Sequence, residues 1–166
     1  MNDITIRTAR QDDIEKINEI TNYSILNSSY NLNTHTMSLR DTIQWFENHI
    51  KTKYPIIVAE SNNIIVGWAS LSKFREFSGY KTTAECSVYV KNEFKRKGIG
   101  FKLLSNLEEK AEKMNIHVLV AVITYNNTAS ITLHKKAGFV TKGILEQIAY
   151  KNGKFFDVKI MTKIIK

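Results

Sequence analysis

The sequence of 166 residues contains a single cysteine, a single proline and no long apolar run. One cysteine cannot build an intrachain disulfide framework or a CxxC zinc site, so no metal is expected. No apolar stretch approaches the roughly 20 residues of a membrane span, and residues 1–8 lack the apolar segment of a signal peptide. We therefore expect a cytoplasmic protein that has no membrane partner.

What the sequence does contain is the composition of a globular domain. Hydrophobic residues make up 43% of the chain and charged residues 24%, which argues against disorder and low-complexity structure. A chain of this length can bury roughly two-thirds of the surface that its unfolded form exposes. Because no repeat or linker interrupts the sequence, we expect one domain over residues 1–166.

The net charge of +8 is unevenly distributed. Residues 1–90 hold nine basic and ten acidic side chains, whereas residues 91–166 hold fifteen and six. A basic excess suggests an anionic partner such as nucleic acid, a membrane surface or a phosphorylated ligand. A nucleic-acid-binding domain would mix its cations with exposed aromatic residues, but most aromatics outside residues 150–156 lie in apolar patterns or in the N-terminal half. That alternative is therefore disfavoured, and no nucleic-acid partner is expected.

Hydrophobic periodicity predicts an α/β protein with a mixed sheet. The apolar run at 118–123 is typical of a strand that is buried on both faces and parallel to a neighbour. The expected elements are a strand at 4–7, a helix that opens at Asp12-Asp13, a loop or broken helix at 22–37, a helix capped by Ser38, strands at 56–60, 64–71, 84–90 and 118–123, helices at 99–115 and 128–137, and a closing hairpin that turns at 151–154.

A glycine turn with three preceding cations links the strand at 84–90 to the next helix. Backbone N–H groups at a helix N-terminus attract an anion, and glycine lets the anion approach without a Cβ in the way. A Walker loop is excluded by the spacing, and Leu103 stands where the dinucleotide fingerprint needs a small residue. The turn therefore predicts a phosphate or pyrophosphate site, with a glycine loop beside solvated lysines as the alternative. Its residues are Lys95, Arg96, Lys97, Gly98, Ile99, Gly100 and Phe101.

The same turn resembles the pyrophosphate loop of the GNAT N-acetyltransferase superfamily, Gln/Arg-x-x-Gly-x-Gly/Ala, with Lys95 in the first position. About 30 residues later, the segment from Asn127 to Phe139 resembles the superfamily's second motif, which has Tyr or His four residues before a glycine. The resemblance implies a GNAT fold of about seven strands and about four helices. In that fold two parallel strands, here 84–90 and 118–123, splay apart to hold acetyl-CoA, which acts as co-substrate.

A closer resemblance is carried by Ile6-Arg7, Tyr54-Pro55, Thr83–Val90, Ala121–Ile123 and Tyr150–Gly153. These segments, which extend over nearly the whole chain, resemble the phosphinothricin and methionine sulfone acetyltransferases. The resemblance implies direct acetyl transfer from acetyl-CoA to the primary amine of a small amino-acid-like acceptor in a ternary complex, by a homodimer that shares its acceptor sites. Transfer to a protein N-terminus, a polyamine or an aminoglycoside is the alternative.

Glu85 is the candidate general base. An amine with a pKa near 10.4 is almost fully protonated at pH 7, and deprotonation costs about 4.6 kcal/mol, so the reaction needs a base. Glu85 interrupts a strand of small and apolar residues, where partial desolvation would raise its pKa. It also matches the family's proposed base; a carboxylate that faces water is the alternative. Cys86 should face away from it as an unreactive buried thiol.

Further site residues follow from the chemistry and the resemblance. The backbone N–H of Val88 or Val90 would stabilise an oxyanion if the strand is bulged. His134 would either protonate the departing thiolate or only pack against the cofactor. By the family resemblance, Arg75 would clamp the carboxylate of the acceptor, with an ordinary arginine on a surface loop as the alternative. The remaining expected contacts are Tyr89, Asn127 and Lys136 for the cofactor, with helix capping and solvation as the alternatives for the last two, and Tyr30 and Leu32 as a second wall of the acceptor site.

Overall fold

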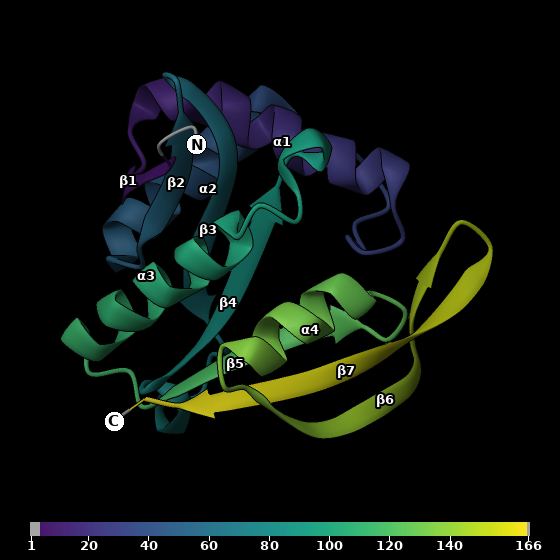
Figure 1. The fold of residues 1–166 in the computed structure, drawn as a ribbon. Coiled ribbons are helices and arrows are strands. Elements are labelled where there is room, and N and C mark those ends of the chain that lie inside the picture. The colour runs from purple at the N-terminus through teal and green to yellow at the C-terminus, as the bar shows by residue number, and fades with distance from the viewer. Residues whose placement is uncertain (1–3, 166) are drawn as a thin grey trace.

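The computed structural model describes residues 4–165, which form a seven-stranded sheet and four α-helices (Figure 1). The strand order is β1-β2-β3-β4-β5-β7-β6, and neighbours are antiparallel except for β4 and β5. This confirms the predicted mixed α/β sheet; residues 1–3 and 166 of the predicted domain lie outside the described residues. The strands are β1 Ile4–Thr8, β2 Ile56–Ser61, β3 Ile64–Lys73, β4 Thr83–Val90, β5 Val118–Thr124, β6 Val140–Lys151 and β7 Lys154–Ile164, and the helices are α1 Ile14–Asn27, α2 Leu39–Thr52, α3 Ile99–Lys113 and α4 Thr128–Lys136.

Each face of the sheet carries its own hydrophobic core. Helices α3 and α4 pack on one face, where the α3 residues Leu103 and Leu107 are fully buried. Helices α1 and α2 pack on the other face, against β2 and β3. Alternate side chains of a strand point to opposite faces, so Cys86 of β4 joins the first core while Tyr89 packs against the second. Truncation of either leucine to alanine would cost about 2–5 kcal/mol.

Two local sequence signals are confirmed. Ser38 caps α2: its Oγ accepts a hydrogen bond from Asp41 N at 3.1 Å, and the Asp41 carboxylate accepts one from Ser38 N at 3.1 Å. The hairpin of β6 and β7 turns at Asn152 and Gly153, whose φ angles of 50° and 77° lie in the left-handed region that such a two-residue turn requires.

The predicted loop or broken helix at 22–37 is wrong in its first part, because α1 continues to Asn27. Ile25 is 3% exposed and extends the apolar face of this helix by two further turns beyond Ile17. Asn22 and Ser24 are half-buried, and Asn22 exchanges hydrogen bonds with the backbone of Met37, so these polar residues do not indicate a loop. No helix within residues 4–165 has the length and apolar character needed to cross a bilayer.

Candidate active site

Strands β4 and β5 start as a parallel pair and then separate, as Figure 1 shows. Their described pairing consists of Thr83 with Val118, Ala84 with Leu119 and Glu85 with Val120. This confirms the predicted splayed pair. Val122 lies beyond the last pair and is 41% exposed, which corrects the expectation that β5 is buried on both faces. Past Val120 no strand covers that side of β5, so its apolar sequence does not produce full burial.

The edge of β4 that faces this gap offers backbone N–H groups without any bulge. β4 pairs residue by residue with β3 from Ala84 to Val90, so the condition of a bulged strand is wrong. Lys91 N donates to Val66 O at 2.9 Å, on the β3 side. Because hydrogen-bonding direction alternates along a strand, the N–H groups of Val88 and Val90 point into the gap, whereas the backbone of Tyr89 faces β3. Divergence of β5 is what leaves these groups free.

The N-terminus of α3 presents further free N–H groups near the same gap. Gly98, with a φ of 78°, precedes the helix, and the first bond within it runs from Lys102 N to Gly98 O at 3.1 Å. The N–H groups of residues 99–101 therefore have no acceptor within the helix. A Cβ on Gly100 would lie 3.0 Å from Leu133 Cδ2, so glycine allows this turn to approach α4 closely.

Cations surround this helix end. The side chains of residues 95–97 are exposed and lie directly before α3. From α4, the Nζ of Lys136 lies 5.1 Å from the centre of the Phe101 ring, which places a fourth cation beside the first turn of α3. Ile99 is 1% exposed and packs in the core, so only its backbone can contact an anion. The arrangement suits a pyrophosphate, because free N–H groups, the helix dipole and mobile cations act together.

Glu85 lies where the two strands part. Its side chain is half-buried, and burial raises the pKa of Glu85 while the nearby charge of Arg75 lowers it. Arg75 is exposed; its Nη1 donates to Phe74 O at 2.8 Å, and the guanidinium lies 4.4 Å from the Phe74 ring centre. Cys86 faces the opposite core, as predicted, and burial raises the pKa of its thiol to about 12. A carboxylate whose pKa is raised by partial desolvation can act as a base near neutral pH.

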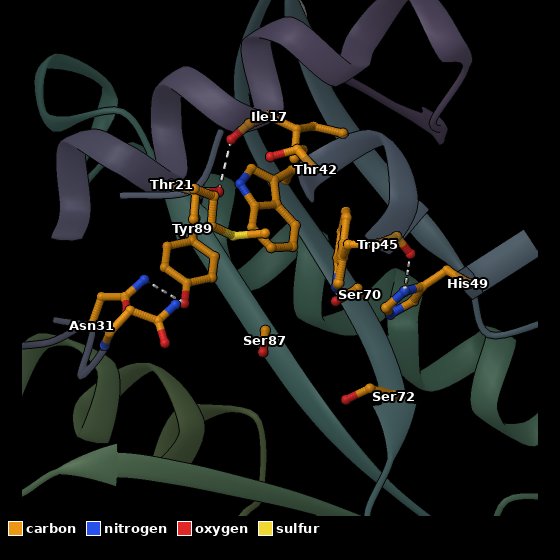
Figure 2. Close-up of a pocket in the computed structure, with 13 residues that line it drawn as sticks. Ile17, Thr21, Asn31, Thr42, Trp45, His49, Ser70, Ser72, Ser87 and Tyr89 are labelled. Atoms are coloured by element: carbon orange, nitrogen blue, oxygen red, sulfur yellow. Dashed lines mark hydrogen bonds between the residues drawn. The ribbon is translucent and has the colours of Figure 1, made fainter. Parts of the chain in front are cut away.

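A cavity of about 280 Å³ opens on the α1/α2 face of the sheet (Figure 2). Glu85 does not line it, but Ser72, its register partner on β3, and Ser87, on the same face of β4, both do. Trp68 stacks on Tyr89 with ring centres 4.6 Å apart, and Trp45 meets Trp68 edge-on at 5.3 Å. Every lining residue is uncharged at neutral pH, including His49, because burial lowers the pKa of this histidine. The cavity therefore suits a neutral group that can pack on aromatic rings and accept hydrogen bonds. Hydroxyl groups reach it from Thr21, Thr42, Ser70, Ser72 and Ser87.

The connection between α1 and α2 closes one side of the cavity through Asn31. This side chain is 6% exposed, and its Nδ2 donates to the Tyr89 hydroxyl at 3.3 Å, as Figure 2 shows. Asn31 and Asn33 line the cavity, whereas the predicted wall residues Tyr30 and Leu32 flank Asn31 and do not line it. Tyr30 is 46% exposed.

Helix α4 places two of the predicted residues. His134 is 3% exposed; its Nδ1 lies 2.8 Å from Ser130 O, and its Nε2 lies 3.8 Å from Cys86 Sγ. A carbonyl partner requires the proton on Nδ1, so Nε2 is an acceptor in the neutral ring, and burial lowers the pKa of His134. The Asn127 Oδ1 accepts from Ser130 N at 3.1 Å, so this residue caps the helix.

Our sequence predictions missed Trp45, His49, Trp68 and the three serines that line the cavity. Strand alternation could have found part of this set, because Trp68, Ser70 and Ser72 share one face of β3 while Ser87 shares a face with Glu85. The contributions of α2 had no such signal, since the packing of a helix on a sheet is not encoded in local spacing.

Comparisons with known proteins agree with this fold. The family model described as an acetyltransferase (GNAT) domain matches residues 6–160. The L-methionine sulfoximine/L-methionine sulfone acetyltransferase of Salmonella typhimurium is 37% identical over 158 residues, which cover 95% of this chain and 92% of that protein. The phosphinothricin N-acetyltransferase of Streptomyces viridochromogenes is 30% identical over an alignment that covers 93% of this chain and 84% of that protein. The structure of yncA from Salmonella typhimurium, solved with its cofactor acetyl-CoA, is 35% identical with a TM-score of 0.96, over 99% of this chain and 95% of that one.

Proposed function

Because the chain belongs to the GNAT acetyltransferase family, we propose that it transfers an acetyl group from acetyl-CoA to the primary amine of a small amino-acid-like acceptor. The predicted family resemblance and GNAT fold are confirmed. One observation carries the proposal: the half-buried Glu85 lies at the last β4–β5 pair, where the open edge of β4 begins, and on the same face of the sheet as Ser72 and Ser87, which line the neutral cavity. The open edge suits the cofactor and the cavity suits the acceptor.

The residues present fit acetyl-CoA, which would supply an activated acetyl thioester. The free N–H groups of residues 99–101 and the cations at 95–97 would hold the pyrophosphate, with Lys136 nearby. The backbone N–H groups of Val88 and Val90 would bind the pantetheine arm along the open edge of β4. Asn127 already caps α4, so contact with the pantetheine arm would use its remaining Nδ2 group.

The protein's own groups would then perform the transfer. Glu85 would take one proton from the ammonium of the acceptor, directly or through water, and the neutral amine would attack the thioester carbonyl carbon. The N–C bond would form as the C–S bond breaks, and the departing thiolate would take up the second proton that the nitrogen loses. The N–H of Val88 or Val90 stabilises the charge that develops on the carbonyl oxygen. Direct transfer is favoured over an acetyl-enzyme, because the thiol of Cys86 is buried and its pKa is about 12. Of the two roles predicted for His134, its neutral, buried ring favours packing.

On the acceptor side, Arg75 would bind the carboxylate while the cavity takes the side chain. A polyamine or an aminoglycoside would bring additional cations to a cavity that has no acidic residue in its lining. That observation favours an amino acid with a neutral polar side chain, such as methionine sulfone or methionine sulfoximine. Tyr30 and Leu32 do not line the cavity, so the second wall predicted for the acceptor site would be formed by Asn31 and Asn33 of the same connection.

A thiol-release assay tests the proposed function. Methionine sulfone, methionine sulfoximine, phosphinothricin, spermidine and kanamycin are compared at equal concentration with acetyl-CoA. Turnover is expected with the amino-acid acceptors, well above the rate of acetyl-CoA hydrolysis. If none of the five amines exceeds hydrolysis, or if only spermidine or kanamycin does, the proposed acceptor class is wrong.

We also propose that the protein is a homodimer that associates through the outer strand of the sheet. β6 is an edge strand, and most of its residues are exposed. Long apolar edge strands are normally covered, because they otherwise promote aggregation. The exposed apolar residues of this edge and of the adjoining turn are Val140, Ile144, Leu145, Ile148, Tyr150 and Phe155. Sedimentation equilibrium is expected to give twice the chain mass, and Ile148→Asp is expected to reduce it; a monomeric wild type contradicts the proposal.

A further inference from the structure

Lys151, the last residue of β6, buries its ammonium group against three backbone carbonyls. It is 2% exposed, and its Nζ donates to Ile25 O at 2.7 Å, Asn31 O at 2.7 Å and Ser28 O at 3.2 Å. These three acceptors match the three protons of an ammonium group. The salt bridges found within residues 4–165 do not include Lys151, so carbonyl dipoles alone balance its charge.

A gain in stability alone does not explain why the ammonium group of Lys151 is buried. Desolvation of an ammonium group is expensive, and burial lowers the pKa of Lys151. An apolar side chain of similar volume would fill the space without that cost. What only a cation with three donors can do here is tie the last turn of α1, at Ile25, to Asn31 six residues later. The C-terminus of a helix also favours a cation, because its last carbonyls lack partners.

The tied segment leads directly to the cavity. Asn31, whose carbonyl oxygen binds Lys151, also donates through its side chain to the Tyr89 hydroxyl on β4. Its neighbour in the same loop, Ser29, accepts a hydrogen bond through Oγ from Asn126 Nδ2 at 3.2 Å. The loop of residues 28–33 is therefore held from the hairpin on one side and from β4 on the other. Movement of this loop would open the wall of the cavity that Asn31 closes.

Lys163 on β7 provides an internal comparison. Its Nζ donates to Ala137 O at 2.6 Å and to Glu108 Oε2 at 2.7 Å, at the C-terminus of α4. It is thus another lysine that holds a helix end, but it is only partly buried and lies on the α3/α4 face of the sheet. A comparison of variants at the two lysines therefore distinguishes a general loss of stability from a specific effect on the cavity.

We propose that Lys151 is a positioning residue for the acceptor site, which holds the 28–33 loop so that Asn31 closes the cavity around the side chain of the acceptor. The proposal rests on the proposed function for the identity of the ligand. The three hydrogen bonds from Lys151 Nζ to Ile25 O, Ser28 O and Asn31 O, called the clasp below, can however be observed in the protein without any ligand.

The test compares wild type, Lys151→Met, Lys151→Arg and Lys163→Met by hydrogen–deuterium exchange and by steady-state kinetics with methionine sulfone. Lys151→Met keeps the length of the side chain but removes the three donors. We expect amides in residues 28–33 to exchange about tenfold faster and the acceptor KM to rise about tenfold, while the KM for acetyl-CoA stays within about twofold. Lys151→Arg retains charge and donors in a planar head that cannot reproduce three divergent bonds, so both changes are expected to be intermediate.

Lys163→Met serves as the stability control. It is expected to lower the thermal midpoint without faster exchange at 28–33 and without a change in the acceptor KM. If Lys151→Met does not fold, Lys151→Arg carries the test through its selective effect on the acceptor KM. Unchanged exchange at 28–33, or equal increases in both KM values in a Lys151 variant that folds, would overturn the proposal. A wild type that does not acetylate methionine sulfone would instead refute the proposed function, and the exchange data would still decide whether the clasp exists.

Discussion

Glu85 of β4 lies opposite Val120 of β5 at the last pair of their parallel ladder, and the two strands separate beyond it. On one side of this point are the gap and the free N–H groups of Val88 and Val90; on the other is the neutral cavity. The sheet thus places one partly buried carboxylate between the two regions proposed to bind the cofactor and the acceptor. The predictions below follow from that position.

Glu85→Gln is expected to raise the thermal midpoint at neutral pH. Burial raises the pKa of Glu85 above its ordinary value of 4.5, so the folded state binds this proton more tightly than the unfolded state does. The contribution of Glu85 to stability therefore falls as the pH rises from 4.5 through its folded-state pKa. Scanning calorimetry at pH 4 and at pH 8 checks this: the advantage of the variant should grow with pH, and an advantage that shrinks would show that Glu85 is not desolvated.

Arg75→Ala is expected to raise the KM for methionine sulfone about tenfold with little change in kcat, because the guanidinium would bind the carboxylate of the acceptor. The matched substrate is 3-(methylsulfonyl)propylamine, which lacks only that carboxylate. Its KM should be nearly the same for wild type and variant. An equal increase for both acceptors would mean that Arg75 shapes the loop and does not clamp a carboxylate.

Gly100→Ala is expected to weaken the binding of acetyl-CoA while leaving the binding of the acceptor little changed. The added methyl group would lie 3.0 Å from Leu133 Cδ2, at the helix end proposed to hold the pyrophosphate. We expect the dissociation constant for CoA, measured by calorimetry, to rise about tenfold while the acceptor KM is little changed. Gly79→Ala is the control, because no atom lies within 4 Å of its added Cβ. If both variants bind CoA as wild type does, this helix end is not the pyrophosphate site.

The neutral cavity is expected to discriminate among acceptors that share the amino-acid end. Methionine sulfone and methionine sulfoximine have uncharged side chains, whereas phosphinothricin carries an anionic phosphinate. Because the cavity lining contains no charged residue, transfer of the anion from water is unfavourable. We expect kcat/KM to be about tenfold or more higher for the two sulfur compounds. Equal values would place the side chain of the acceptor outside this cavity.

Much of the fold was predictable because its signals are local. The apolar spacing of α3, the capping box at Ser38 and the Asn152-Gly153 turn each depend on a few adjacent residues. The prediction at 22–37 failed because the end of α1 is fixed by the burial of Ile25 and by hydrogen bonds between Asn22 and the backbone of Met37, and local composition shows neither. The exposure of Val122 likewise depends on where β5 leaves β4, and that divergence is a property of two strands together.

The candidate site likewise has one part that local sequence predicted and another part that it did not. The glycine turn at 95–101 and Glu85 were predicted from contiguous sequence. The cavity was not, because its aromatic wall combines Trp45 from α2, Trp68 from β3 and Tyr89 from β4. The clasp at Lys151 spans more than one hundred residues to Ile25, and an isolated lysine in a basic C-terminal half carries no sequence signal of burial.

The central claim is that Glu85 deprotonates the acceptor amine, and the pH dependence of kcat/KM for methionine sulfone tests it most directly. For wild type we predict an acidic limb in which activity falls as the pH drops through the raised pKa of Glu85. For Glu85→Gln we predict a rate about 10²-fold to 10⁴-fold lower, loss of that limb and an unchanged dissociation constant for CoA. A variant that retains the wild-type rate and the same acidic limb would contradict the account.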